Sequence, residues 1–447
     1  MNRGSKLKVF LLFAGDAVLL YAALLATLFI RYDGAFWRQF VDIHAAPFTI
    51  VFIPWLLVFY IAGLYDLRRL RNNLDFLKTL SLALVANALI ASLLFYLVPS
   101  FGIAPKTNLF IFLVLFAVIE ALWRRFFNRM TASGEAPNRL LLVGDGGAAA
   151  EIEDTLTANV QLGYAVVARL AEDEAARDPK RLAALVAETR ANLIAVPAAL
   201  KRRRALAPAL YALFGRGISV TDVETLYETV MRKVPLDEVE ETWFLENIEG
   251  AARFYDQFKR GIEFAAALAI GVALLPIELA IALLVAVTSR GPAIYRQTRV
   301  GAHGRRFTLY KFRTMRTDAE AGTGARWADG AHDPRITAFG RFLRTSHLDE
   351  LPQLWNIVRG DLSFVGPRPE RPEFVEKLRA EVPFYEVRLL ALPGVTGWAQ
   401  INHRADRTTD DVREKLRYDI YYLKHRSPIL DLAIVLRTLK SLFVNPE

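Results

Sequence analysis

Two adjacent carboxylates, Asp349 and Glu350, have the setting that best suits chemistry in this sequence. They lie in the stretch LDELPQLWN. Basic residues able to hold phosphate oxygens lie on both sides of them: Lys311, Arg313, Arg344 and Arg368. Carboxylates beside phosphates usually imply Mg2+, a hard ion that takes one or two carboxylates plus substrate oxygens. The same residues also fit surface salt bridges and a helix cap, and spacing alone leaves both interpretations open.

The residues around the two acids predict a helix. We expect Asp349 to be the N-cap of a helix that continues to Val358, with Pro352 in its first turn and Gly360 at its end. A start at Ser346 is the alternative, but it would put Pro352 in the helix interior. Either start places both acids at the positive end of a helix dipole, which favours ionised carboxylates and nearby phosphate. Because adjacent helical side chains diverge, the acids are expected to take separate roles.

Further motifs surround these acids from about Lys259 to the end of the chain. They are KFRTM, LDELPQLWN, GDLSFVGPRPE, PGVTGWAQIN and YDIYYLK, in this order. In these motifs the segment resembles the bacterial sugar transferases, the monotopic polyprenyl-phosphate phosphoglycosyl transferases. The resemblance implies transfer of a sugar 1-phosphate from a UDP-sugar to undecaprenyl phosphate at the cytoplasmic membrane face. That reaction is the first membrane step of exopolysaccharide, capsule or O-antigen assembly.

The resemblance also implies roles for individual residues. Asp349 matches the family's nucleophile, which attacks the β-phosphate, expels UMP and forms a covalent phospho-sugar intermediate. Glu350 matches the partner acid, associated with Mg2+ or with proton handling, and Arg368 matches a phosphate contact. The remaining candidates for substrate binding have no assigned individual role: Lys311, Arg313, Arg344 and Asp419.

Two departures from the family pattern bear on this expectation. Leu275 precedes the membrane proline, Pro276, where the family often has a small polar residue. After GWAQIN, His403 and Arg404 replace the family's common Gly-Arg or aromatic-glycine pair. This loop is expected to face the donor, so the identity of the sugar is open. His403 is either a substrate contact or an exposed loop histidine.

Composition indicates a membrane protein. Of 447 residues, 53% are hydrophobic, and the net charge is +9. Apolar runs at residues 7–30, 47–66, 79–98 and 108–123 each approach the length of a membrane-spanning helix. Basic residues cluster before the first run, between the second and third, and after the fourth, which predicts both ends of the bundle in the cytoplasm. Asp16 in the first run marks either a transport path or an acid facing a neighbouring helix.

Other classes fit the composition less well. Nucleic acid is not expected as a partner, because the basic residues flank apolar runs and no nucleic-acid-binding motif is visible. The sequence contains no cysteine, which excludes disulfides, metal thiolates and a thiol nucleophile.

Residues 131–250 alternate between strand-like and helix-like stretches, which predicts a parallel sheet with helices on both faces. Gly144, Gly146 and Ala149 fit a loose G-x-G-x-x-A fingerprint. Glu172 lies somewhat late for a ribose-binding acid. The fingerprint therefore indicates either a bound dinucleotide or, more simply, a structural turn between a strand and a helix.

A last apolar run covers residues 262–288 and is long enough to cross a membrane. Pro276 near its middle removes a backbone hydrogen bond and bends the helix. Basic residues flank both ends: Lys259, Arg260, Arg290, Arg296 and Arg299. Because both ends look cytoplasmic by the same charge rule, we expect a re-entrant helix over residues 258–289.

The complete expectation is a protein of the bacterial inner (plasma) membrane with its active site on the cytoplasmic face. Its parts are a four-span α-helical membrane bundle (1–130), a Rossmann-like α/β domain (131–250) and a mainly helical monotopic catalytic domain (251–447). Expected partners are a UDP-sugar, undecaprenyl phosphate and membrane lipid, and the α/β domain could pair subunits into a homo-oligomer. Two other functions compete: a membrane-bound nucleotide-sugar dehydratase, and a non-catalytic scaffold of polysaccharide assembly. The first is disfavoured because no second glycine fingerprint follows a strand in the last third, and the second because Asp349, Glu350 and Arg368 are all retained.

Overall fold

The computed structural model describes most of the chain in two compact units. The described residues are 3–70, 72–98, 101, 106–133, 138–248, 253–289, 291–316, 333, 335–403 and 408–444. The units are Met1–Met231 and Arg232–Glu447. The finer division with domain ends at residues 130 and 250 stays a prediction.

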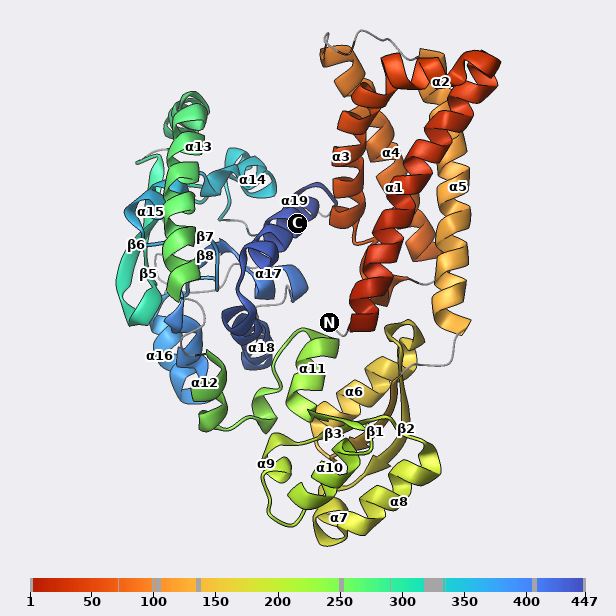
Figure 1. Ribbon diagram of the computed structural model, residues 1–447. Helices are drawn as coiled ribbons and strands as arrows, with labels where there is room; N and C mark the ends of the chain where they lie inside the picture. The colour runs from red at the N-terminus through yellow and green to blue at the C-terminus, as the bar shows by residue number, and fades with distance from the viewer. Residues whose placement is uncertain are drawn as a thin grey trace. The chain divides into compact units, whose positions relative to one another are not determined.

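The first unit begins with a bundle of long apolar helices (Figure 1). These are α1 (Arg3–Tyr32), α3 (Ala45–Ala62), α4 (Leu74–Leu97) and α5 (Lys106–Ser133). Short helical turns join them: η1 (Asp33–Ala35), α2 (Phe36–Gln39), η2 (Phe40–His44) and η3 (Leu67–Arg69). Aromatic rings fill the inside, among them Phe52, Trp55 and Phe112. Leucines such as Leu82 and Leu89 are exposed, as expected of helices that face lipid.

Within the described residues, three helical segments are long and apolar enough to cross a membrane. They are Lys6–Ala62, Leu74–Leu97 and Tyr255–Thr288, and the first contains both α1 and α3. Helix α5, which contains the fourth predicted run, is not one of the three. The predicted count of four spans in the bundle is therefore not confirmed.

Asp16 lies in a fully buried cluster of charged residues inside the bundle. One of its carboxylate oxygens pairs with Arg124, and the other accepts a hydrogen bond from Trp123 Nε1 at 3.1 Å. Arg124 Nε also donates to Glu120 at 2.6 Å, and its Nη1 donates to the Leu64 carbonyl at 2.7 Å. These contacts support the simpler interpretation of Asp16 as an acid that faces a neighbouring helix.

The first unit continues into a four-stranded parallel sheet of order β2-β1-β3-β4. The strands are β1 (Asn138–Val143), β2 (Tyr164–Leu170), β3 (Leu193–Val196) and β4 (Ser219–Asp222). The helices are α6 (Gly147–Ala158), η5 (Val160–Leu162), α7 (Glu172–Arg177), α8 (Pro179–Thr189), α9 (Ala198–Lys201), α10 (Ala207–Phe214) and α11 (Val223–Met231). Alternate residues of β1 enter two separate cores: Leu141 packs with α8 and α10, and Leu142 with α6 and α11. The parallel sheet with helices on both faces is confirmed, whereas a closer likeness to dinucleotide-binding domains is not.

The glycine turn after β1 is bridged by protein side chains. Gly144 has φ +138°, a conformation that favours glycine. Its carbonyl accepts a hydrogen bond from Arg169 Nε at 2.9 Å, and Arg169 also pairs with Glu153 at 3.2 Å. These contacts support the interpretation of the fingerprint as a structural turn.

The second unit is mainly helical, as predicted, with two small sheets. Its helices are α12 (Glu241–Ile248), α13 (Arg253–Thr288), α14 (Ala338–Thr345), α15 (Gln353–Arg359), α16 (Pro372–Glu381), α17 (Trp398–Asn402), α18 (Thr409–His425) and α19 (Pro428–Val444). Its 3-10 turns are η6 (Leu236–Glu238), η7 (Ala302–Gly304), η8 (Leu348–Glu350) and η9 (Tyr385–Leu390). Strands β5 (Ile294–Val300) and β6 (Arg306–Phe312) form an antiparallel hairpin, and β7 (Ser363–Val365) pairs with β8 (Gly394–Thr396) in parallel.

Helix α13 is the predicted membrane segment of the second unit. It continues as one helix through Pro276, so the proline does not interrupt it. Near its start, Lys259 Nζ donates to the Val365 carbonyl at 2.7 Å. Just beyond its end, Ser289 Oγ accepts from Arg313 at 2.8 Å. Both ends of the apolar stretch are thus bound to the same unit, whereas many apolar side chains between them, Leu275 included, are exposed.

Candidate active site

Asp349 and Glu350 lie in the 3-10 turn η8, one turn ahead of helix α15. The prediction that Asp349 caps this helix is wrong, because α15 begins at Gln353 and Pro352 occupies the N-cap position. The left-handed conformation of His347, with φ +54°, separates η8 from the preceding helix α14. The predicted end of the helix at Gly360 is confirmed, and that glycine has φ +78°.

Glu350 is held by two basic residues. Lys311 Nζ on strand β6 lies 2.5 Å from Glu350 Oε1, and Arg368 Nη2 lies 3.9 Å from the same oxygen. Burial alone would raise the pKa of Glu350. The positive charges of Lys311 and Arg368 outweigh burial and lower the pKa to about 2, so Glu350 is ionised at neutral pH.

Asp349 has a different environment from its neighbour. Within the described part of the chain, its side chain makes no hydrogen bond and no ion pair, although it is mostly buried. Burial raises its pKa, and the negative charge of Glu350 adds to that effect, while Lys311 and Arg344 oppose it. The structure therefore presents one carboxylate that is engaged by cations and, beside it, one that is not.

Arg344 is positioned by helix α14, which ends beside η8. Its Nε donates to Thr314 Oγ1 at 2.9 Å. The first turn of α14 is capped by Thr337, whose hydroxyl accepts from the Gly340 amide at 2.9 Å. A Cβ added at Gly340 would lie 2.0 Å from the Thr314 carbonyl oxygen, so only glycine allows this close approach. The packing of α14 on residue 314 thus fixes where Arg344 projects.

Arg313, the next predicted site residue, makes its hydrogen bonds at the end of helix α13. Its Nη2 donates to the Ser289 carbonyl at 3.0 Å, the Ser289 hydroxyl at 2.8 Å and the Gly291 carbonyl at 3.1 Å. The side chain is buried at the end of α13. Arg313 Nη2 thus holds the end of the membrane helix, whereas the buried Nε and Nη1 have no hydrogen-bond partner among the described residues. Its role in substrate binding stays a prediction.

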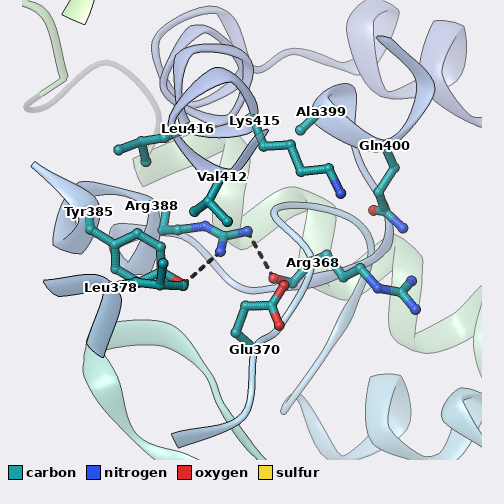
Figure 2. A pocket seen from close by; sticks show the side chains of 10 residues that line it. All are labelled: Arg368, Glu370, Leu378, Tyr385, Arg388, Ala399, Gln400, Val412, Lys415 and Leu416. Atoms are coloured by element: carbon teal, nitrogen blue, oxygen red, sulfur yellow. Dashed lines mark hydrogen bonds between the residues drawn. The ribbon is translucent and has the colours of Figure 1, made fainter. Parts of the chain in front are cut away.

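Asp419 lies on helix α18. It is almost fully buried and pairs with Arg388 at 2.9 Å. Arg388 in turn donates to the Tyr385 hydroxyl and to the main-chain carbonyl of Arg368, each at 3.0 Å (Figure 2). Asp419 is therefore linked through Arg388 to the loop that carries Arg368, and its direct contact with a substrate stays a prediction.

Arg388 is the residue that the sequence motifs did not reveal. It lies in VRLLALPG, where an arginine between apolar residues carries no recognisable pattern. The one available signal was Asp419 itself, because a buried carboxylate in the middle of a helix requires a cationic partner.

His403 makes a contact within the protein. Its Nε2 lies 3.2 Å from Asp411 Oδ1, and Asp411 also forms the capping box of α18 with Thr408. Residues 404–407, which include Arg404, lie outside the described residues. The contact favours a structural role for His403 over a substrate contact.

The donor set at Asp349 and Glu350 fits Mg2+ held by carboxylates together with substrate oxygens. No group of three or more His, Asp or Glu side chains able to hold a metal occurs among the described residues. The two acids would therefore supply the protein ligands, and phosphate oxygens and water would supply the others.

Comparisons with known proteins identify the family of the last part of the chain. Residues 254–445 match the family model described as "Bacterial sugar transferase". A UDP-glucose:undecaprenyl-phosphate glucose-1-phosphate transferase of Caulobacter vibrioides is 40% identical over 192 residues, which are 42% of this chain and 71% of the relative. The chain belongs to the bacterial sugar transferase family.

Larger relatives match over a smaller part of their length. A UDP-N-acetylgalactosamine-undecaprenyl-phosphate N-acetylgalactosaminephosphotransferase of Aeromonas hydrophila is 36% identical over 228 residues, 51% of this chain and 53% of the relative. A UDP-glucose:undecaprenyl-phosphate glucose-1-phosphate transferase of Xanthomonas campestris pv. campestris is 41% identical over 165 residues, 36% of this chain and 34% of the relative. The matched part of this chain thus spans about a third to a half of these two relatives. Their names do not favour the dehydratase or scaffold alternatives.

Proposed function

We propose that this protein transfers a sugar 1-phosphate from a UDP-sugar to undecaprenyl phosphate through a covalent intermediate on Asp349. One observation carries the proposal: Glu350 is engaged by Lys311 and Arg368, whereas Asp349 beside it has no hydrogen bond or ion pair among the described residues. A carboxylate without a protein partner in a cationic site is available to attack a phosphorus atom. The names of the relatives agree with a reaction of this class.

The first step forms a bond between Asp349 and the donor. An Asp349 Oδ attacks the β-phosphorus of the UDP-sugar, and the bond from that phosphorus to the bridging oxygen breaks. UMP leaves with the bonding electrons. Lys311, Arg344 and Arg368 would hold the phosphate oxygens, because their positive charges offset the charge of the attacking carboxylate.

The second step restores the enzyme. A phosphate oxygen of undecaprenyl phosphate attacks the same phosphorus, and the bond to Asp349 breaks. The product is a sugar linked to the lipid through a diphosphate. Mg2+, when bound by Asp349 and Glu350, would supply further positive charge beside the transferred phosphoryl group.

The membrane geometry supports an acceptor that is a lipid. Both ends of α13 are bound to the second unit, through Lys259 at one end and Ser289 at the other, so both ends would lie on one side of a membrane. We propose that α13 enters and leaves the cytoplasmic leaflet of the bacterial inner membrane, as the flanking basic residues also indicate. The reaction would then start the assembly of a cell-surface polysaccharide.

The test uses the detergent-solubilised full chain with Mg2+, undecaprenyl phosphate and a panel of UDP-sugars, including UDP-glucose and UDP-N-acetylgalactosamine. We expect the wild-type protein to release UMP from at least one donor and Asp349→Asn to release UMP at least roughly 1000-fold more slowly. Asp361→Asn is the matched control, because Asp361 pairs with Arg359 after α15 and contacts neither acid. Unimpaired UMP release by Asp349→Asn would reject Asp349 as the nucleophile.

A second measurement addresses the covalent intermediate. Without undecaprenyl phosphate, labelled UMP is expected to exchange into the UDP-sugar, because the first step is reversible on its own. Chelation of Mg2+ is expected to abolish both exchange and net UMP release, and added Mg2+ to restore them. Net transfer without any exchange would instead support direct attack of the lipid phosphate on the donor.

A further inference from the structure

A small pocket lies beside Arg368 and is lined partly by residues of helices α17 and α18 (Figure 2). Its lining residues are Arg368, Glu370, Leu378, Tyr385, Arg388, Ala399, Gln400, Val412, Lys415 and Leu416. Leu378, Val412 and Leu416 form an apolar side, while Gln400 and Lys415 extend from the two helices toward Arg368. Gln400 and Lys415 have no role in the proposed reaction so far.

Gln400 has a polar atom that the fold leaves unused. Its Nε2 donates to the Val395 carbonyl at 3.2 Å, which sets the direction of the amide. Its Oε1 is buried and has no hydrogen-bond partner in the described part of the chain. A buried amide oxygen without a partner is costly, so this atom is suited to accept from an O–H or N–H group of a ligand.

The helix that carries Gln400 is held firmly. Trp398, two residues earlier on α17, donates from Nε1 to the Arg232 carbonyl at 2.9 Å. The Trp398 ring also stacks on Tyr421 of α18, with 5.9 Å between ring centres. Gln400 therefore faces the pocket from a fixed position, as a recognition residue requires.

The charge of the pocket favours an anionic ligand. Arg388 is compensated by Asp419 at 2.9 Å, so the cations that face the one lining acid, Glu370, are Lys415 and Arg368. The acid is further offset by Arg299, which lies 3.6 Å from it. A phosphate group would match this excess of positive charge, whereas the hydroxyls of a neutral hexose would not need it.

The position of the pocket decides which phosphate of the donor it suits. Arg368 both lines the pocket and approaches Glu350 to 3.9 Å, so it joins the pocket to the two acids. In phosphoryl transfer the attacking and leaving oxygens lie roughly in line on opposite sides of the phosphorus. With Asp349 attacking, the nucleotide leaves on the side of the phosphorus away from the two acids, and Arg368 extends from those acids to the pocket.

We infer that this pocket binds the nucleoside-phosphate half of the donor, the part that leaves as UMP. Lys415 and Arg368 contact its phosphate, and Gln400 Oε1 accepts a hydrogen bond from a ribose hydroxyl. The inference rests on the proposed transferase function, and it adds Gln400 and Lys415 to the substrate-binding residues.

The test measures the inhibition constant of UMP and the KM for the UDP-sugar on the full chain. Lys415→Gln is expected to raise both about tenfold, and Gln400→Leu about threefold to tenfold, because each removes one polar contact to the nucleotide. The ratio of kcat/KM between two UDP-sugars is expected to stay unchanged. In Lys415→Arg, both constants are expected to stay within about threefold of wild type, because the positive charge is kept. This variant therefore distinguishes an effect of the lost charge from an effect on folding. Lys377→Gln, on an exposed face of α16, is the control for the loss of a lysine.

Two outcomes would overturn the inference. If the UMP constant stays at the wild-type value in Lys415→Gln and Gln400→Leu, the pocket does not hold the nucleotide. If the ratio of kcat/KM between two UDP-sugars changes while the inhibition constant of UMP does not, the pocket holds the sugar. A wild-type protein that releases no UMP from any donor would instead count against the proposed function, while direct titration with UMP would still test the pocket.

Discussion

The membrane bundle and the candidate active site each contain two carboxylates with nearby cations. The two regions differ in how many of these carboxylates are paired with a cation. In the bundle, Asp16 and Glu120 share the guanidinium of Arg124 in a cluster closed to solvent. In the second unit, cations engage Glu350, while Asp349 makes no hydrogen bond or ion pair among the described residues. The same residue types thus serve structure in one place and, in the function that we propose, chemistry in the other.

The difference teaches that partner geometry, more than residue type, separates a structural acid from a reactive one. A buried carboxylate whose oxygens are taken by Arg and Trp donors stabilises the fold, since its desolvation is compensated. A carboxylate that faces cations without contacting them remains available to a phosphate. Substitutions in the two regions should therefore affect different measured quantities.

The largest effect on stability is expected from Arg124→Met in the bundle. The change leaves two buried carboxylates without their shared cation, which costs about 3–5 kcal/mol in the free energy of unfolding. Thermal unfolding of the solubilised protein measures the effect. Arg125→Met is the control, because Arg125 follows directly and its side chain is exposed. Equal melting temperatures for both variants would contradict the structural role of the cluster.

A smaller effect, on activity, is expected from Lys311→Met. This change removes the cation that lies 2.5 Å from Glu350, and charge-assisted contacts of this kind are worth about 1.5–3 kcal/mol. The rate of UMP release should fall roughly tenfold to hundredfold. Lys377→Met serves as a control, since the Lys377 side chain is 67% exposed. A rate of UMP release equal to that of the wild type would show that the activity does not depend on the contact between Lys311 and Glu350.

Gly15→Ala tests how closely the bundle cluster is packed. A Cβ at residue 15 would lie 2.4 Å from the Trp123 ring, so the ring that donates to Asp16 must move. We expect a loss of about 1–3 kcal/mol in the free energy of unfolding, measured by chemical or thermal denaturation. Gly34→Ala is the matched control, because nothing lies within 4 Å of a Cβ there. The interpretation fails if the two variants lose the same stability.

Thr337→Ala is expected to have the smallest effect. It removes the hydroxyl that caps α14 and should cost about 1 kcal/mol. Because α14 positions Arg344, a rise of a few-fold in the KM for the UDP-sugar is expected alongside the lower melting temperature. Thr345→Ala, at the other end of the same helix, should leave the KM unchanged. If the KM is unchanged in Thr337→Ala as well, the helix cap does not determine the position of Arg344.

Several parts of the architecture follow from local pattern. The alternation of β1 between two cores was predictable because a strand places successive side chains on opposite faces. The end of α15 at Gly360 was predictable because glycine adopts the left-handed conformation that ends a helix. The start of the same helix was not, because Asp349 and Glu350 form the separate 3-10 turn η8 and α15 begins only at Gln353, after Pro352.

The candidate site was predictable in part. The structure brings together Asp349, Glu350, Lys311, Arg344 and Arg368, whose roles in catalysis and binding stay predictions. Arg313 and Asp419 make contacts elsewhere, with Ser289 and with Arg388, which are distant from them in the sequence. Charge and motif identify residues able to bind phosphate, but the direction of a side chain depends on packing.

By itself, the sequence determined that this protein has apolar helices long enough for a membrane, a parallel α/β segment and the motifs of a bacterial sugar transferase. Those features depend on composition, periodicity and order along the chain. Only the tertiary structure decided that Asp349 lacks the partners that Glu350 has, that Asp419 acts through Arg388 on the loop of Arg368, and that Gln400 directs an unused oxygen into a pocket. Each of these depends on distances between residues far apart in the chain, which local pattern does not encode.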